Sequence, residues 1–236
     1  INALPAGITP TLMTVIGSQA FFSATTLDGG TELWRTDGTS AGTFMVKDIA
    51  GGTASSSPSS LVNFNGTLYF QANNSTNGTE LWKSDGTSAG TVLVKDINVG
   101  VLGSAPSNLT VAGSTLYFSA NESTNGTELW KSDGTSAGTV LVTNIAAGAT
   151  SSSPANFANV NGTLFFTATD AINGVELWKS DGSAGGTVLV KDIVAGATSS
   201  SPTLLTALGS ALFFVVNDTV NGSELWSSDG TTAGTA

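Results

Sequence analysis

Two carboxylates recur through this chain at a constant spacing, and they are its strongest candidates for chemistry. The five aspartates are Asp37, Asp85, Asp133, Asp181 and Asp229, and the five glutamates are Glu32, Glu80, Glu128, Glu176 and Glu224. Paired carboxylates can hydrolyse glycosides, and carboxylate oxygens also bind calcium. Hydrolysis needs one protonated and one ionised carboxylate, held in different environments. Near-identical copies create identical environments, so we predict that the chain is not an enzyme.

The composition narrows the chemistry further. The chain contains no Cys and no His, which excludes thiol nucleophiles, Cys-based metal sites and His general bases. A catalytic Ser would need a base such as His or a suitably placed Lys, and no Gly-x-Ser-x-Gly motif is present. We expect no cofactor, and the sequence leaves open only calcium, in the polar loops.

A structural role explains both carboxylates. Each Asp precedes a Gly, and an Asp in that position caps the N–H groups of its own turn. Each Glu precedes Leu-Trp, and we expect it to pair with a nearby lysine (Lys83, Lys131 or Lys179) or to lie at the edge of a sheet.

The spacing of these residues is a repeat of 48 positions. Trp34, Trp82, Trp130, Trp178 and Trp226 keep it without an insertion. The copies are 1–48, 49–96, 97–144, 145–192 and 193–236, which we call repeats 1 to 5. We predict that they form a single domain, 1–236, and that this domain is a piece of a longer chain.

Each repeat divides into four short strands. In the second repeat we expect strands at Ser60–Asn63, Thr67–Ala72, Thr79–Lys83 and Thr91–Asp96. Asn65-Gly66 separates the first two strands, and Asn-Gly between apolar runs is a strong hairpin signal because both residues accept positive φ. Asp85-Gly86 does the same between the last two strands.

Four strands per repeat of this length are typical of a β-propeller blade. We predict an all-β, five-bladed propeller with four antiparallel strands per blade and the recurrent Trp packed between blades. A β-solenoid is the alternative, but its coils are shorter and lack tight hairpins. The fifth repeat ends before the residues that correspond to Met45–Asp48, so we expect the last blade to lack its outer strand.

The motif itself resembles a known family. ELWRTDGT at 32–39, ELWKSDGT at 80–87 and 128–135, ELWKSDGS at 176–183 and ELWSSDGT at 224–231 are similar to the bacterial ELWxxDGT repeats. The resemblance implies a large secreted or surface-associated protein and supplies no catalytic residue. The SDGT segment is also similar to the Asp-box turns of other propellers. Blade number and repeat length give a looser likeness to tachylectin-2-type lectins.

A ligand would bind the longer loops between strands two and three, which all lie on one propeller face. These loops are rich in Asn, Asp, Ser and Thr, which suit sugar hydroxyls or a hard cation, and repeated weak sites would act together on a polymer or a cell surface. The candidate binding residues are Asp28, Asn74, Asn77, Asn121, Asn125, Asp170, Asn173, Asp218 and Asn221.

The net charge of −10 and the pI near 4.1 oppose binding to nucleic acid or to anionic membranes. Two functions stay open. One is a secreted or cell-surface module that binds glycans through its loops. The other is a structural or assembly subunit that contacts other surface proteins, or copies of itself, through the open edge of its last blade.

Overall fold

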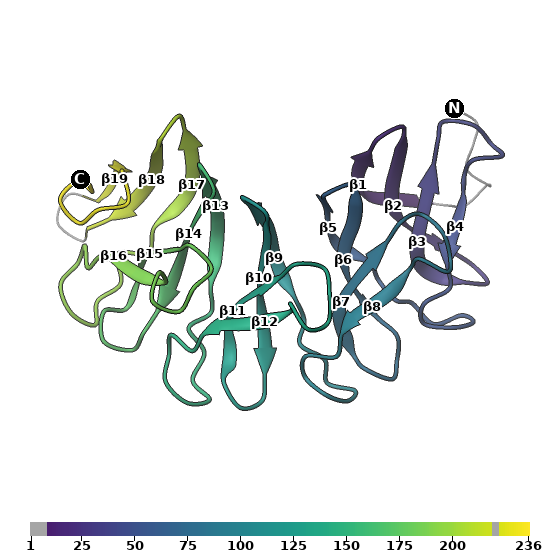
Figure 1. The fold of residues 1–236 in the computed structure, drawn as a ribbon, viewed down its shortest axis with the longest axis horizontal. Coiled ribbons are helices and arrows are strands. Elements are labelled where there is room, and N and C mark those ends of the chain that lie inside the picture. The colour runs from purple at the N-terminus through teal and green to yellow at the C-terminus, as the bar shows by residue number, and fades with distance from the viewer. Residues whose placement is uncertain (1–8, 219–221) are drawn as a thin grey trace. The chain divides into compact units, whose positions relative to one another are not determined.

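The computed structural model describes residues 9–218 and 222–236. Their regular structure consists of strands that form five antiparallel sheets, one for each repeat (Figure 1). The first sheet contains β1 (Thr9–Ile16), β2 (Gln19–Thr26), β3 (Gly30–Thr36) and β4 (Phe44–Lys47). The second contains β5 (Ser59–Phe64), β6 (Thr67–Asn73), β7 (Thr79–Ser84) and β8 (Val92–Lys95).

The remaining sheets repeat this pattern. The third contains β9 (Ser107–Ala112), β10 (Thr115–Glu122), β11 (Gly126–Ser132) and β12 (Val140–Thr143). The fourth contains β13 (Ala155–Val160), β14 (Thr163–Thr169), β15 (Val175–Ser180) and β16 (Val188–Lys191). The fifth contains β17 (Thr203–Leu208), β18 (Ala211–Asn217) and β19 (Ser223–Ser228).

Within each sheet the strands follow chain order, each paired with its sequence neighbours. Four sheets have four strands and the fifth has three, which agrees with the outer strand that the sequence lacks there. A single bridge between Ser228 and Thr235 stands beside β19 in place of a fourth strand.

By backbone contacts the chain divides into two compact units. One comprises 1–109 with 134–136, and the other comprises 110–133 with 137–236. Strand β9 crosses the boundary between them.

The hairpins form where the sequence predicts them. Asn65 and Gly66 both have positive φ, at 54° and 80°, as do Asn161 and Gly162, at 50° and 88°. Positive φ at both central residues defines the type I′ turn, whose twist matches that of the flanking strands. The local sequence therefore determines the register of these two hairpins.

The second strand of each repeat supplies the core, because it is apolar on both faces. Leu68 and Phe70 of β6 are buried on one face and Tyr69 on the other, and in β14 the same holds for Leu164 and Phe166 with Phe165. Continuous apolar runs of this kind are typical of strands that are covered on both sides.

Neighbouring sheets share apolar clusters. In the first unit, Leu33 and Val46 of the first sheet pack with Leu68, Phe70 and Trp82 of the second. The fourth and fifth sheets make the same contact through Phe165, Leu177, Val190, Leu212, Phe214 and Trp226. The recurrent Trp thus lies where one sheet meets the previous one. Repeats 1 and 2, 3 and 4, and 4 and 5 therefore share their apolar cores.

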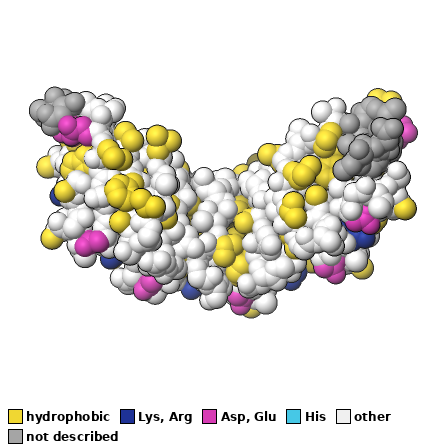
Figure 2. All heavy atoms as spheres, turned by 90° about the horizontal axis from the view of Figure 1, so that it is seen from above, with side chains coloured by type: hydrophobic (Ala, Val, Ile, Leu, Met, Phe, Trp, Pro, Cys, Tyr) yellow, Lys and Arg dark blue, Asp and Glu magenta, His cyan; other side chains and the backbone are white. Residues whose placement is uncertain are grey.

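The surface carries few charged side chains and several exposed apolar ones. Figure 2 shows few Lys, Arg, Asp or Glu side chains on the face in view, in keeping with a charged fraction of 10%. No helix among residues 9–218 and 222–236 is long and apolar enough to cross a bilayer.

Candidate functional site

The repeated Glu is buried and binds the segment that links its own sheet to the next one. We call this segment, 96–106 after the second sheet, the connector. Glu80 lies in β7 with no exposed surface. Its Oε1 accepts hydrogen bonds from the N–H groups of Ser104, at 2.8 Å, and Asn98, at 3.2 Å. Its Oε2 accepts from the Ser104 hydroxyl at 2.5 Å and the Ile97 N–H at 3.2 Å. One carboxylate therefore satisfies four donors of a connector that would otherwise bury them without partners.

The same arrangement recurs in the other internal repeats. Each buried Glu accepts from a connector Ser located 24 residues later, through both the N–H and the hydroxyl. We call each such Glu–Ser pair a connector latch. The four latches are Glu32–Ser56, Glu80–Ser104, Glu128–Ser152 and Glu176–Ser200.

Burial dominates the electrostatics of the latches. It raises the pKa of Glu80 above its usual value of 4.5, although the hydrogen bonds from Ser104, Ile97 and Asn98 oppose the shift. The pKa values of Glu32, Glu128 and Glu176 are raised for the same reason. All four carboxylates have the same kind of partners. Their environments therefore do not separate one of them as a general acid and another as a general base.

The expected pairing of these glutamates with lysines is wrong. Glu80 and Lys83 are three positions apart on one strand, and successive strand residues face opposite sides of a sheet. The lysines instead bind the Asp-Gly turn of the following repeat. Lys83 donates to the carbonyl of Gly134 at 2.9 Å, and Lys131 and Lys179 donate to those of Gly182 and Gly230 at 2.8 Å.

The repeated Asp closes the turn in which the sequence places it. Asp85 Oδ1 accepts from the N–H and the hydroxyl of Thr87, at 2.8 and 2.7 Å. The hydrogen bonds from Thr87 lower the pKa of Asp85. Asp37, Asp181 and Asp229 bind the residue two positions later in the same way, and their pKa values are also lowered. Asp133 lies in the corresponding turn after β11.

A glycine five residues after each Asp makes room for this turn. A Cβ atom added to Gly90 would overlap the carboxylate of Asp85, and one added to Gly186 would overlap that of Asp181. The motif thus extends from the Asp-Gly pair to a second glycine that its geometry also requires.

The loop residues predicted to bind a ligand are largely engaged within their own loops. Asn74 Oδ1 accepts from the N–H of Asn77, and Asp170 Oδ1 accepts from that of Asn173, both at 2.8 Å. Asn77 also donates to Asp96 Oδ2 at 2.6 Å. These side chains set the loop conformation, which reduces the hydrogen-bonding capacity left for a ligand.

The other predicted residues are more varied. Asn121 donates to Thr127 Oγ1 at 3.2 Å, and Asn125 donates to Glu122 Oε2 at 2.5 Å. Asp28 is exposed in the loop between β2 and β3, and Asp218 is half-buried after β18. Asn221 lies outside the described residues. Among the predicted residues that the structure describes, it brings together Asn74 with Asn77 and Asp170 with Asn173, each pair within one loop.

One further repeated position, just after the fourth strand, is not among the candidate sites identified from the sequence. The Oδ1 atoms of Asp96, Asn144 and Asp192, each just after the fourth strand of its repeat, are buried and accept no hydrogen bond. Asp96 and Asn144 also contact the loop residues Asn77 and Asn125. Buried unpaired oxygens are unusual and suit a water molecule or a cation. Their spacing of 48 residues could have identified them.

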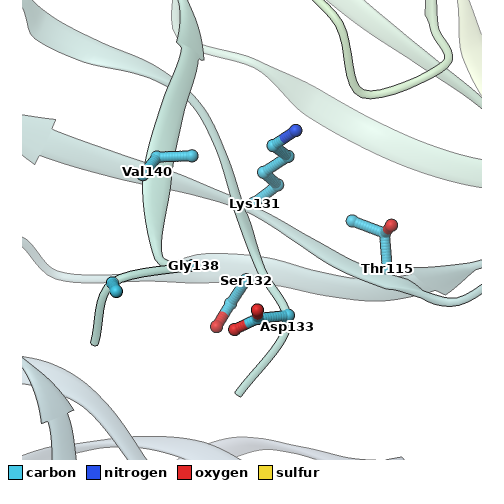
Figure 3. A pocket seen from close by; sticks show the side chains of 7 residues that line it. Thr115, Lys131, Ser132, Asp133, Gly138 and Val140 are labelled. Carbon is cyan, nitrogen blue, oxygen red and sulfur yellow. The ribbon is translucent and has the colours of Figure 1, made fainter. Parts of the chain in front are cut away.

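Two surface hollows lie at the tight turns, among residues other than the nine predicted ones. The first, of about 320 Å³, is lined by Thr115, Lys131, Ser132, Asp133, Ala137, Gly138 and Val140 (Figure 3). Lys131 extends away from Asp133 (Figure 3) to reach the Gly182 carbonyl, and the Ser132 and Thr139 hydroxyls share a hydrogen bond of 2.7 Å. The polar groups of this hollow thus serve the turn and the next repeat.

The second hollow has a volume of about 200 Å³ and includes Lys179, Asp229 and Gly230. Lys179 is again bound to the glycine carbonyl, and Asp229 to Thr231. The first hollow is therefore lined by the third repeat alone, whereas the second lies between the fourth and fifth repeats.

Comparison with known proteins finds no matching family model and no matching curated protein. Solved structures do match. A puromycin hydrolase mutant in complex with PGG superimposes with a TM-score of 0.61 at 14% identity, over 100% of this chain and 38% of that one. A puromycin-hydrolyzing peptidase of Mycobacterium tuberculosis gives 0.57 at 13%, over 99% and 38%.

The GH74 xyloglucanase of Xanthomonas campestris matches with a TM-score of 0.51 at 16% identity, over 93% of this chain and 36% of that one. This chain therefore spans less than two fifths of each of these solved chains. At such identities the likeness concerns the fold alone. The chain is an all-β protein whose antiparallel sheets resemble those of propeller-like folds.

Proposed function

We propose that the five sheets are successive blades of a β-propeller that acts as a non-catalytic scaffold in a secreted or cell-surface protein. The observation that carries this proposal is the connector latch. Each latch uses a fully buried Glu to fasten one repeat to the next. The four buried glutamates, which the sequence offers as candidates for chemistry, thus bind the connector to the next repeat.

Three further features support a scaffold. The repeated Asp residues bind within their own turns, three lysines bind the following repeat, and several loop amides bind within their own loops. A chain without Cys also suits an extracellular protein, because an unpaired thiol is a liability there.

A glycan array, read with calcium and again with a chelator, tests the proposal on protein shown to be folded by circular dichroism. A scaffold gives a blank array under both conditions, and electron microscopy of the protein then shows regular rods or lattices. Selective and saturable binding to one class of glycan would contradict the scaffold role.

A second candidate function is calcium-assisted binding of a polar ligand on the loop side. The observation that favours it is the row of unpaired Oδ1 atoms on Asp96, Asn144 and Asp192. Carboxylate and amide oxygens are the ligands that calcium prefers, and equivalent sites would add avidity on a repetitive surface.

Terbium luminescence tests this candidate, because Trp residues in the repeats can sensitise a lanthanide bound in place of calcium. Saturable emission that calcium displaces, and that the double variant Asp96→Ala/Asp192→Ala loses, would support it. Asp28→Ala is the matched control, because Asp28 is an exposed loop carboxylate at a different position of the repeat. Emission unchanged by the double variant would reject the site.

A further inference from the structure

The fifth repeat keeps the motif residues that join repeats, yet leaves them exposed. Leu33, Leu81, Leu129 and Leu177 have no exposed surface, whereas the equivalent Leu225 is 72% exposed. Glu224 is likewise exposed, while its four counterparts are fully buried. The outer face of the fifth sheet, which we define by Phe213 and Leu225, is thus built like an internal junction without its partner, and Glu224 in β19 lacks the connector that its counterparts bind.

The internal junctions show which chemistry covers such a face. Leu177 is covered by Leu212, Phe214 and Val216, which alternate along β18 of the following repeat. Glu176 is satisfied by the N–H and hydroxyl groups of Ser200 and by the N–H of Ile193. A partner must therefore present an apolar second strand together with a connector serine.

The first repeat of this chain, or of a second copy, is poorly suited to this role. In the sequence, Ile8 stands where the internal connectors have Ser56, Ser104, Ser152 and Ser200, so no hydroxyl would reach Glu224. The residues that would receive the fifth sheet are also already covered. Phe22, Ala24 and Trp34 are 2%, 1% and 7% exposed.

We propose that the outer face of the fifth sheet docks one further repeat of this same kind, carrying serine at the position of Ser56. This inference rests on the scaffold role proposed above and names the partner of that scaffold. Burial of Leu225 and a fifth connector latch at Glu224 would form the junction. Ser227 replaces the lysine found at 83, 131 and 179, so the junction lacks the bond from lysine to glycine.

A single thiol can report on this junction, because the chain has no Cys. Leu225→Cys is labelled with a thiol reagent in the 236-residue chain and in an extended chain with a copy of residues 45–92 appended after Ala236. The copy continues the 48-residue register and brings its own connector serine. We expect rapid labelling in the first protein, and labelling at least about 100-fold slower in the second, because the thiol then reacts only after the junction opens.

The matched control is the extended chain with Ser56→Ile in the appended copy, which imitates Ile8 and should lose most of the protection. Equal labelling with and without the appended repeat would overturn the proposal. So would slow labelling of the 236-residue chain itself. Labelling of the 236-residue chain that is slow at every protein concentration would mean that its own first repeat covers the face. Labelling that is slow only at high protein concentration would mean that a second copy of the chain covers it.

These outcomes are independent of the glycan array. A protein that binds glycans could still dock a further repeat, and a protein with a blank array could fail to protect Leu225→Cys. Failure of the docking proposal can therefore be distinguished from failure of the scaffold role.

Discussion

A single type of residue, the Glu before Leu-Trp, has two environments in this chain. Four copies are fully buried, and each accepts hydrogen bonds from a connector up to 24 residues away. The fifth copy, Glu224, has the same local sequence but is exposed. The difference arises because the donors come from the next repeat, and it offers a matched pair of sites within one protein.

Replacing Glu80 with Gln should lower the free energy of unfolding by about 2 kcal/mol, because an amide N–H₂ group cannot accept the bonds that Oε2 receives and leaves buried donors unpaired. Glu224→Gln should change it by less than about 0.5 kcal/mol, as for other exposed positions. Urea unfolding of both variants measures the difference. Equal losses at the two sites would show that the latch adds nothing to stability.

The pH dependence of stability follows from the same carboxylates. Burial raises the pKa of Glu32, Glu80, Glu128 and Glu176 above 4.5, so their contribution is complete below pH 4.5 and is lost as the pH rises through the raised values. The turn aspartates have pKa values below 3.8, so their contribution is lost as the pH falls below 3.8. We expect stability to be greatest at about pH 4.

Urea titrations between about pH 2 and pH 8 test this profile, with Glu80→Gln as the control because it should flatten the decline above pH 4.5. Stability that rises steadily from pH 4 to pH 7 would contradict the assignment of raised pKa values to the buried glutamates.

At the scale of elements, the hairpins and Asp-Gly turns are the best-determined parts of the repeat. Their hydrogen bonds join residues two to four positions apart, as in Asp85–Thr87 and Thr87–Thr91. Short separations let the sequence predict the strands of the second repeat to within one or two residues of β5, β6, β7 and β8.

Two adjacent glycines isolate the steric requirement of the turn. Gly186→Ala should lower the free energy of unfolding by about 1–3 kcal/mol, because its Cβ would overlap the Asp181 carboxylate. Gly185→Ala meets open space and should be neutral, or stabilising by up to about 1 kcal/mol. Thermal unfolding of the two variants provides the comparison, and a harmless Gly186→Ala would mean that the turn tolerates a different conformation.

For the whole molecule, stability comes from contacts between neighbouring repeats, as expected for repeat architectures. The junctions between repeats 1 and 2, 3 and 4, and 4 and 5 combine an apolar cluster with a latch, and three lysines add hydrogen bonds to the turn of the following repeat. The fifth repeat contributes to one such junction through Phe214 and Trp226, while Leu225 on its other side remains exposed.

Truncating equivalent leucines should reveal this asymmetry. Leu177→Ala removes a fully buried side chain and should cost about 2–5 kcal/mol. Leu225→Ala, at 72% exposure, should cost less than about 0.5 kcal/mol. Calorimetry of both variants decides the matter, and a large loss at Leu225 would mean that this face is covered in solution.

The sequence by itself determined the period, the strands and the turns, because each depends on residues close together in the chain. It also predicted that the fifth sheet lacks its outer strand, since the residues for it are absent. It located the polar loops, but could not show that Asn74 and Asp170 bind their own loops, because the paths of those loops depend on packing.

Only the tertiary structure decided the roles of the Glu and Lys residues. Glu80 meets donors 17 to 24 positions away, and Lys131 reaches a carbonyl 51 positions away. Such partners belong to the connector or to the next repeat, so no local pattern identifies them. The same reason explains why one motif is buried at Glu176 and exposed at Glu224: its environment is created by the neighbouring repeat.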